Sequence, residues 1–205
     1  MKKKAFILIG IVVGLLLFDQ LFKIWVKTHM VLGESIPMLG NWFFIRFIEN
    51  EGMAFGLSFG GELGKVLLSL FRVVLVTLII IYLYRLLKTQ TPMGVMIGLV
   101  LILAGAIGNI IDSLFYGLIF NDPVGEVATM FPPEGGYAGF LHGRVVDMLH
   151  FPIIDTTLPS WLPFIGNKHF EFFRPVFNIA DSSISVGVIY LLLFQRNFFT
   201  KPQKE

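Results

Sequence analysis

The 205-residue sequence contains no cysteine, and charged residues make up only 15% of it. Without cysteine the chain can form no disulfide, no thiol nucleophile and no cysteine-ligated metal site. The net charge of +2 is too small to indicate a nucleic-acid partner. We also find no internal repeat. The histidines show no spacing typical of a metal motif, so we expect no metal and assign no role to His29, His142, His150 and His169.

Hydrophobic residues account for 55% of the chain, which also has 22 Phe and 21 Gly. This apolar share is above that of ordinary soluble domains, and the charged share is below theirs. Glycine is more frequent in membrane helices than in soluble ones. The composition therefore indicates an integral membrane protein.

Four apolar runs are long enough to cross a membrane, which takes about 20 residues. We predict a single membrane domain over residues 1–205, with spans at about 5–27, 65–87, 93–114 and 176–194. The start "MKKK" before an apolar run also fits a secretory signal peptide. However, the run continues through "DQLFKIWVK" without reaching a small-residue cleavage site, so we predict an uncleaved first span.

The two longer connections differ from the spans. Residues 30–64 mix aromatic and β-branched residues with glycine, which predicts short strands and turns at the membrane surface. Residues 117–175 are rich in proline and glycine, and there we expect irregular structure with short amphipathic pieces around "GRVVDML". The predicted fold is thus an all-α membrane protein of four helices with small elements on one face.

Lys and Arg are concentrated around the termini and the short turn near residues 88–92. Because cytoplasmic loops carry an excess of these residues, we predict that both termini and this turn are cytoplasmic and that the longer connections face outward. The residues concerned are Lys2, Lys3, Lys4, Arg85, Lys88, Arg196, Lys201 and Lys204.

Most polar residues of the spans then fall at one depth, near the outer surface. An ion pathway would be expected to place acids across the whole thickness, whereas a cluster at one end fits a site that acts at the outer face. The clustered residues are Asp19, Lys23, Lys65, Ser69, Arg72, Asn109, Asp112, Asn178 and Asp181.

Two acids are flanked by apolar residues, Asp181 in "FNIADSSISVG" and Asp147 in "HGRVVDMLHF". A carboxylate is costly within the membrane, so each is a candidate functional residue. Together they fit a pair that shares one proton. Alternatively, each acid only caps a helix or meets a single basic partner.

Other polar pairs have structural alternatives as well. Asp19 and Lys23 are four residues apart, as in an intrahelical ion pair, or Asp19 also braces the outer loop. Asn109 and Asp112 in "GNIID" share a helix face, and either join helices or line a polar pocket. The segment "NEGMAFG" fits an ordinary turn, and Asn178 fits a helix N-cap.

Two other functional classes remain open from the residues alone. One is a small transporter or channel that uses Asp19, Asp112 and Asp181 for ions, although transporters often show repeats and midplane sites that this sequence lacks. The other is a non-catalytic assembly factor whose polar groups hold helices together.

Four sequence blocks, in this order and combined with four spans, resemble the lipoprotein signal peptidases (signal peptidase II). They are "DQLFK" with Asp19, Gln20 and Lys23, "NEGMAFG" with Asn50, Gly52, Ala54 and Phe55, "GNIID" with Gly108, Asn109 and Asp112, and "VVDM" with "FNIADSSI". The blocks are spread over nearly the whole chain.

The resemblance implies an aspartyl protease of the bacterial inner membrane, with Asp147 and Asp181 as its catalytic acids. It places supporting residues at Asp19, Asn50, Asn109, Asp112 and Asn178, and Lys23 and Gly52 stand in the same blocks. It also implies a small β-sheet cradle on the outer membrane surface and a mobile helical loop over the site.

The resemblance further implies a substrate, a bacterial prolipoprotein whose Cys carries diacylglycerol, which is cut just before that Cys. No cofactor is needed. We expect contact with membrane lipids, a monomer, and inhibition by globomycin-type cyclic peptides, as in the family.

The sequence departs from the family pattern in several places. Ser113 stands where the family has Arg after "GNxxD", and Arg144 or Arg174 is the candidate replacement. Met148 stands where Phe is usual. Residues 121–141 and 152–175 are longer than the family norm, and their sequences indicate no function.

Overall fold

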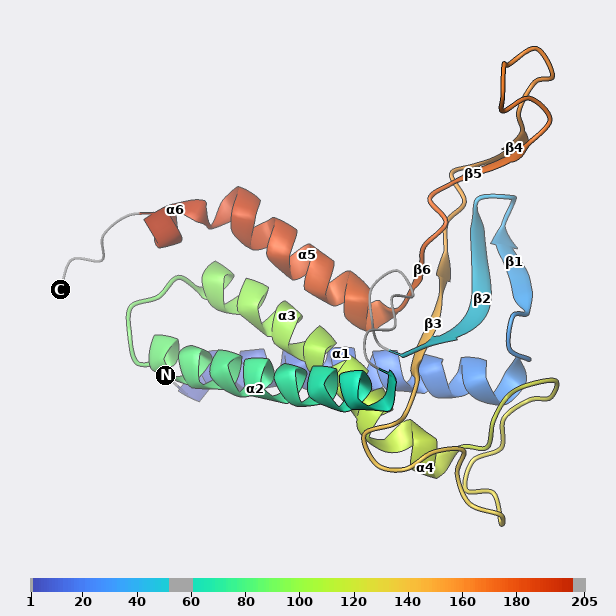
Figure 1. The fold of residues 1–205 in the computed structure, drawn as a ribbon. Coiled ribbons are helices and arrows are strands. Elements are labelled where there is room, and N and C mark those ends of the chain that lie inside the picture. Colours follow the sequence, from blue (N-terminus) through green and yellow to red (C-terminus); the bar gives the residue numbers. More distant parts are fainter. Residues whose placement is uncertain (1, 52–60, 201–205) are drawn as a thin grey trace.

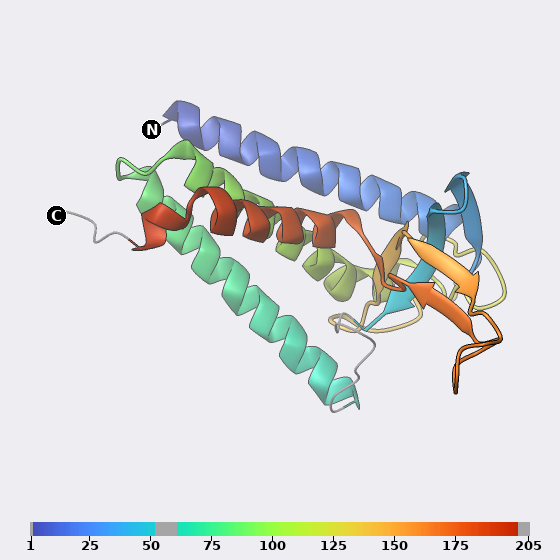
Figure 2. The ribbon, with the colours of Figure 1, turned by 90° about the horizontal axis from the view of Figure 1, so that it is seen from above.

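The computed structural model describes residues 2–51 and 61–200, where long apolar helices pack together with a small antiparallel sheet at one end (Figure 1). The long helices are α1 (Lys2–His29), α2 (Gly61–Leu87), α3 (Met93–Ile111) and α5 (Ile179–Phe194). Shorter helical segments are the π-helical η2 (Asp112–Tyr116), α4 (Gly117–Ile119) and α6 (Arg196–Thr200). The start of α1 and the short helix α6 both lie at the end opposite the sheet (Figures 1 and 2).

Three helical stretches are long and apolar enough to cross a membrane: Lys2–His29, Leu63–Leu87 and Met93–Ile119. The apolar helix Ile179–Phe194 is shorter. Most large side chains along α2 and α5 are exposed, as expected where helices face lipid. The molecule is therefore a membrane-protein fold with several apolar helices and small antiparallel sheets.

The fourth predicted span does not begin at residue 176. Val176–Phe177 form strand β6, and α5 begins at Ile179. Asn178 between them has extended backbone angles (φ −118°, ψ 179°) and is the N-cap of α5, because its side chain accepts a hydrogen bond from the Asp181 amide. The polar cap thus separates strand from helix, a boundary that hydrophobicity alone does not mark.

Glycines bring α3 and α5 into close contact. A Cβ atom on Gly105 would lie 2.2 Å from the carbonyl oxygen of Ala180, and one on Gly98 would lie 2.5 Å from Leu191. A Cβ on Gly187 would lie 2.7 Å from the Gly98 carbonyl oxygen. Small residues at such positions allow helix backbones to approach within membranes. This contact sets Asn109, near the end of α3, beside the start of α5.

The main sheet has the order β1-β2-β3-β6, with antiparallel neighbours. Its strands are β1 (Ser35–Leu39), β2 (Phe43–Asn50), β3 (Val145–His150) and β6. The prediction of short strands after the first span is confirmed by β1 and β2. The expectation of short amphipathic pieces around "GRVVDML" was wrong, because Val145–His150 form an almost wholly buried strand that pairs with β2 on one side and β6 on the other.

Residues 151–175 form a projection that we call the arm. Its strands β4 (Ile154–Thr157) and β5 (His169–Phe172) pair in antiparallel register as a separate two-stranded sheet. The arm extends away from the helices beside the main sheet (Figures 1 and 2). The prediction of irregular structure was wrong here, because residues 154–157 pair one by one with residues 172–169 as a hairpin whose strands are mostly exposed.

Two apolar clusters enclose a polar layer. One lies beneath the sheet and includes Val26, Phe47 and Tyr116. The other joins the helices nearer their opposite ends and includes Leu8 and Leu103. Along α1 and α3, the polar residues discussed next lie between these clusters.

Candidate active site

Asp147 lies on the central strand β3 and is only 4% exposed. Its carboxylate accepts a 2.7 Å hydrogen bond from the side-chain amide of Asn178 and a second from the amide of Asn50 at the end of β2. Because β3 pairs with β2 so that Asn50 opposes Val145, the register of the sheet brings Asn50 to this acid.

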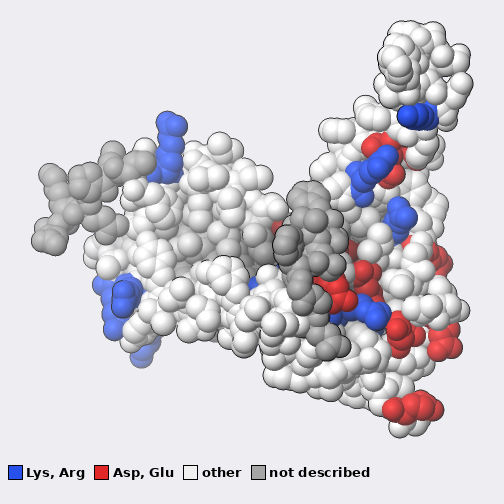
Figure 3. All heavy atoms as spheres, in the orientation of Figure 1, with Lys and Arg blue, Asp and Glu red and all other residues white. Residues whose placement is uncertain are grey.

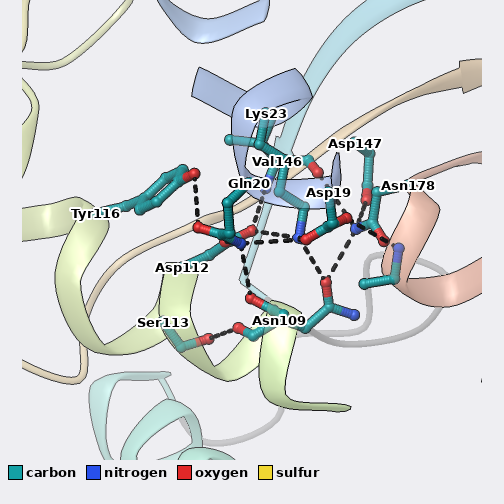
Figure 4. A network of polar contacts seen from close by, with 12 residues as sticks. Asp19, Gln20, Lys23, Asn109, Asp112, Ser113, Tyr116, Val146, Asp147 and Asn178 are labelled. Carbon is teal, nitrogen blue, oxygen red and sulfur yellow. Dashed lines mark hydrogen bonds and ion pairs between the residues drawn. The ribbon is translucent and has the colours of Figure 1, made fainter. Parts of the chain in front are cut away.

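Asp181 lies in the first turn of α5 and is half-buried. Its Oδ1 accepts a 2.7 Å hydrogen bond from Nδ2 of Asn109 on α3. Its backbone amide donates to Oδ1 of Asn178 at 2.8 Å. Asn178 also donates to Oδ1 of Asn109 at 3.1 Å. The two asparagines therefore join both acids in one network. Figure 4 shows the part of it around Asn109, Asn178 and Asp147.

Lys23 is the fully buried cation of this network. Its Nζ lies 2.9 Å from Asp19 and 2.8 Å from Asp112, and it donates to Asn109 at 3.0 Å. A buried charge is tolerated when it is paired and hydrogen-bonded. The predicted intrahelical pair of Asp19 and Lys23 is present, and it also reaches α3.

Asp19 and Asp112 each hold a backbone amide of a segment that carries an acid. Asp19 Oδ1 accepts from the amide of Ala180 at 2.9 Å, and Asp112 Oδ2 accepts from the amide of Val146 at 3.3 Å. Asp19 thus braces the start of α5. These bonds hold the residues immediately before Asp181 and Asp147.

Gln20 links the same groups, a role that the sequence did not reveal. Its Nε2 donates to Asp112 at 2.9 Å and to Asp19 at 3.1 Å, and its Oε1 accepts from the Tyr116 hydroxyl at 3.1 Å. Its place in the block "DQLFK" was the available signal. Tyr116 belongs to η2, and π-helical turns occur often at functional sites.

The electrostatics distinguish Asp147. Burial raises its pKa, the negative charge of Asp181 raises it further, and Lys23 with the amides of Asn50 and Asn178 partly oppose the shift, giving a pKa of about 7. An ordinary Asp titrates near 3.9. A carboxyl that retains its proton near neutral pH beside a second acid is suited to acid–base chemistry.

Arg144 and Arg174, the candidate replacements for the family arginine at position 113, have other surroundings. Arg144 pairs with Glu49 and Asp122 at 3.2 and 3.1 Å, and its guanidinium stacks over Tyr137. Arg174 is exposed on the arm. Ser113, where the family has arginine, donates to the Asn109 carbonyl oxygen at 3.1 Å.

Of the other candidates, Gly52 lies outside the described residues. Met148 is fully buried in the cluster beneath the sheet. The mobile helical loop implied by the resemblance is not found in residues 30–51 or 117–178, apart from the three-residue α4. Within residues 2–51 and 61–200, no group of three or more His, Asp or Glu side chains is arranged to bind a metal.

Lys27 is a buried charged residue that was not predicted from the sequence. It pairs with Glu49 of β2 and lies 5.1–5.8 Å from the ring centroids of Phe47, Phe120 and Tyr137. Its spacing four residues after Lys23 was the available signal. The pair fixes the end of α1 to the strand that carries Asn50.

Residues 11–197 match the family model for signal peptidase (SPase) II. The chain belongs to the signal peptidase II family. The lipoprotein signal peptidase of Porphyromonas gingivalis (strain ATCC 33277) is 52% identical over 185 residues, covering 90% of this chain and 80% of that protein. The lipoprotein signal peptidase of Amoebophilus asiaticus is 37% identical over 205 residues, covering 98% and 83%.

The fold is also similar to that of a bacterial membrane enzyme solved by the in meso method, with a TM-score of 0.60, 24% identity, and coverage of 97% of this chain and 93% of that one. Membership of the signal peptidase II family makes the chain a peptidase that hydrolyses the bond between a signal peptide and the protein behind it. This excludes the transporter and assembly-factor alternatives as its primary function.

Proposed function

We propose that Asp147 and Asp181 together catalyse this hydrolysis as an aspartyl pair. The observation that carries the proposal is their shared network: Asn178 contacts both residues, and Asp181 raises the pKa of Asp147. Two neighbouring carboxyls that cannot both ionise freely are the arrangement by which aspartic proteases share one proton.

In this mechanism, the ionised acid takes a proton from a water molecule as its oxygen attacks the carbonyl carbon of the scissile bond. The protonated acid donates its proton to the carbonyl oxygen. Collapse of the tetrahedral intermediate breaks the C–N bond, and a proton passes to the leaving amine. The two protons belong to the coupled pair, so neither role is assigned to one named Asp.

Lys23, Asp19, Asp112 and Gln20 act as positioning residues in this proposal. They bind the backbone of the segments that hold the acids, or one another: Asp19 accepts from Ala180, Asp112 accepts from Val146, and Lys23 and Gln20 connect these two acids. Asn50 and Asn178 donate directly to Asp147 and favour its ionised form, and Asn109 donates to Asp181.

The substrates follow from the relatives, which are lipoprotein signal peptidases. The chain accordingly removes signal peptides from prolipoproteins. We propose that it cuts just before a Cys that carries diacylglycerol, as the family does. A lipid-anchored Cys would hold the scissile bond near the membrane surface, which matches the position of the acids at the sheet end of the helices.

We also propose that α1, α2, α3 with its extension, and α5 are four spans of a single membrane domain over residues 1–205. The 16 residues of α5 rise about 24 Å, somewhat less than the roughly 30 Å of a bilayer core. The adjoining β6 and α6 lie at its two ends and would occupy the interfaces.

The charge distribution supports an orientation with both termini in the cytoplasm of the bacterium and the sheet on the outer, periplasmic side of the inner membrane. In the view of Figure 3, only Lys and Arg are seen at the end of the molecule near the termini, whereas around the sheet Asp and Glu are mixed with Lys and Arg. This is the asymmetry of the positive-inside rule.

A monomer suffices for this site, because one chain supplies all the groups described, from α1, α3, η2, β2, β3 and α5 with its N-cap. Globomycin-type cyclic peptides would inhibit the enzyme by binding at the same two acids.

The proposed reaction is tested by incubating the purified protein with a diacylglyceryl prolipoprotein in the presence of a metal chelator. We expect release of the signal peptide and a mature protein beginning with the lipidated Cys. Absence of cleavage, or cleavage only with added metal, would contradict the proposal.

A further inference from the structure

The arm, residues 151–175, exposes aromatic and aliphatic side chains at its far end. We call residues 158–167, which connect β4 and β5, the tip. Trp161 is 77% exposed, Phe164 96% and Ile165 46%. Water-soluble surfaces rarely gather such side chains at one protruding turn unless they meet a partner.

The tip is a folded turn and not a loose loop. Leu162 N donates to the Pro159 carbonyl oxygen at 3.2 Å, Gly166 N to Leu162 at 3.0 Å, and Asn167 N to Leu158 at 3.0 Å. A Cβ on Gly166 would lie 2.8 Å from the Ser160 carbonyl oxygen, so glycine permits this close packing. Because its backbone groups bond to one another, the tip can enter a less polar medium at reduced cost.

Charge is distributed unevenly along the arm. The tip contains no Asp, Glu, Lys or Arg, and Lys168 follows it directly. Near the base, Glu171 pairs with His150 at 3.0 Å, and Asp155 pairs with His169 at 3.3 Å. Figure 3 shows the uncharged end of the arm with basic atoms at its lower edge. An apolar end bordered by a cation suits a phospholipid surface, where the cation meets phosphate.

The arm lies between the sheet strand β3 and the start of α5. Residue 151 follows β3, and residue 175 is three positions before the N-cap of α5. The strands β4 and β5 have four residues each, and the eleven residues from the tip to the N-cap of α5 reach at most about 36 Å at roughly 3.3 Å each. The arm extends sideways past α5 and not back over the polar network (Figures 1 and 2).

We propose that the tip inserts into the interfacial region of the lipid bilayer and anchors the arm on the membrane surface. Trp is enriched at this depth because its ring is amphipathic. Since the arm continues β3 and β6, the contact would hold the strands next to Asp147 and Asn178 against the membrane. The inference requires that the helices span a bilayer, but it depends neither on the catalytic pair nor on which side the sheet faces.

The test exploits the absence of cysteine. Phe164→Cys, in the otherwise unchanged chain, is labelled with a nitroxide and reconstituted in liposomes of phosphatidylethanolamine and phosphatidylglycerol. Power-saturation EPR then compares collisions with oxygen, which concentrates in lipid, and with a water-soluble nickel chelate. The matched control is Glu134→Cys, an exposed residue of the other outer loop.

We expect the oxygen-to-nickel accessibility ratio at position 164 to exceed that at 134 several-fold. Equal ratios would overturn the proposal. Inaccessibility to both reagents with spin–spin broadening would show that a second copy covers the tip, and would also overturn it. If Phe164→Cys does not fold, Trp161→Cys is read by the same criteria.

Discussion

The side-chain amide of Asn178 lies 2.7 Å from the carboxylate of Asp147, although one residue caps a helix and the other is in the middle of a strand. The same asparagine accepts a hydrogen bond from the amide of Asp181. A single side chain therefore fixes the end of β6, the start of α5 and the centre of β3 relative to one another. The geometry of the two acids depends on this junction.

Replacement of either acid should abolish cleavage. We expect Asp147→Asn and Asp181→Asn each to lower kcat by about 10²–10⁴-fold or more, because asparagine can neither accept nor supply the catalytic proton. Turnover of a lipidated prolipoprotein measures this, and helical circular dichroism checks the fold. Asp155→Asn, which changes an exposed acid of the arm, is the matched control and should retain activity. Near-normal turnover of either catalytic variant would refute the pair.

The pH profile should have an alkaline limb near neutrality. The pKa of Asp147 is raised to about 7, partly by the charge of Asp181, so the pair of acids holds a proton below that pH and loses it above. We expect kcat/KM to fall about tenfold per pH unit on the alkaline side, since one essential proton is lost.

The variant Asn50→Ala provides a directional check on that limb. Asn50 donates to the Asp147 carboxylate and lowers its pKa, so its removal should raise this pKa and move the alkaline limb to higher pH. Asp122→Asn, at the outer salt bridge with Arg144, should leave the limb in place. If the alkaline limb stays at the same pH in Asn50→Ala, it does not arise from titration of Asp147.

Close packing of α3 on α5 should be required for both stability and activity. Gly105→Ala places a methyl group against the Ala180 carbonyl oxygen, which must move, and overpacking typically costs about 1–3 kcal/mol. We expect a lower thermal midpoint and reduced kcat, because the shift separates Asn109 from Asp181. Gly10→Ala, which meets no atom within 4 Å, should change neither. Equal effects of the two would contradict the role of this contact.

The proposed orientation predicts where reporters are active. A compartment-sensitive reporter fused after Glu205, or inserted in the turn at residues 88–92, should report the cytoplasm. The same reporter inserted at Glu134 should report the outer side. A fusion after Glu205 that is active only outside would reverse the topology and remove the argument from site depth.

The diacylglyceryl group should be required for efficient cleavage. Burial of acyl chains contributes about 0.8 kcal/mol per CH₂, so two chains would supply much of the binding energy and set the depth of the scissile bond. Matched prolipoproteins with and without the lipid should differ strongly in kcat/KM in one membrane mimic. Similar values would indicate a more general membrane protease.

The sequence by itself determined the membrane character of the chain, because long apolar runs have no other stable environment. It also singled out Asp147 and Asp181, since acids flanked by apolar residues are costly unless they have a function. The sequence also predicted helix boundaries where polarity changes abruptly, as at residues 87–93 between α2 and α3.

Only the tertiary structure decided which strands pair and which distant side chains bond to one another. The strand β3 was invisible because a short apolar segment reads equally as strand or helix piece, and only its neighbours β2 and β6 settle the choice. The links made by Gln20 and Lys27 span 92 and 22 residues, and no local pattern encodes such distances. The raised pKa of Asp147 likewise arises from burial and from a charge on another element, which exist only once the chain is folded.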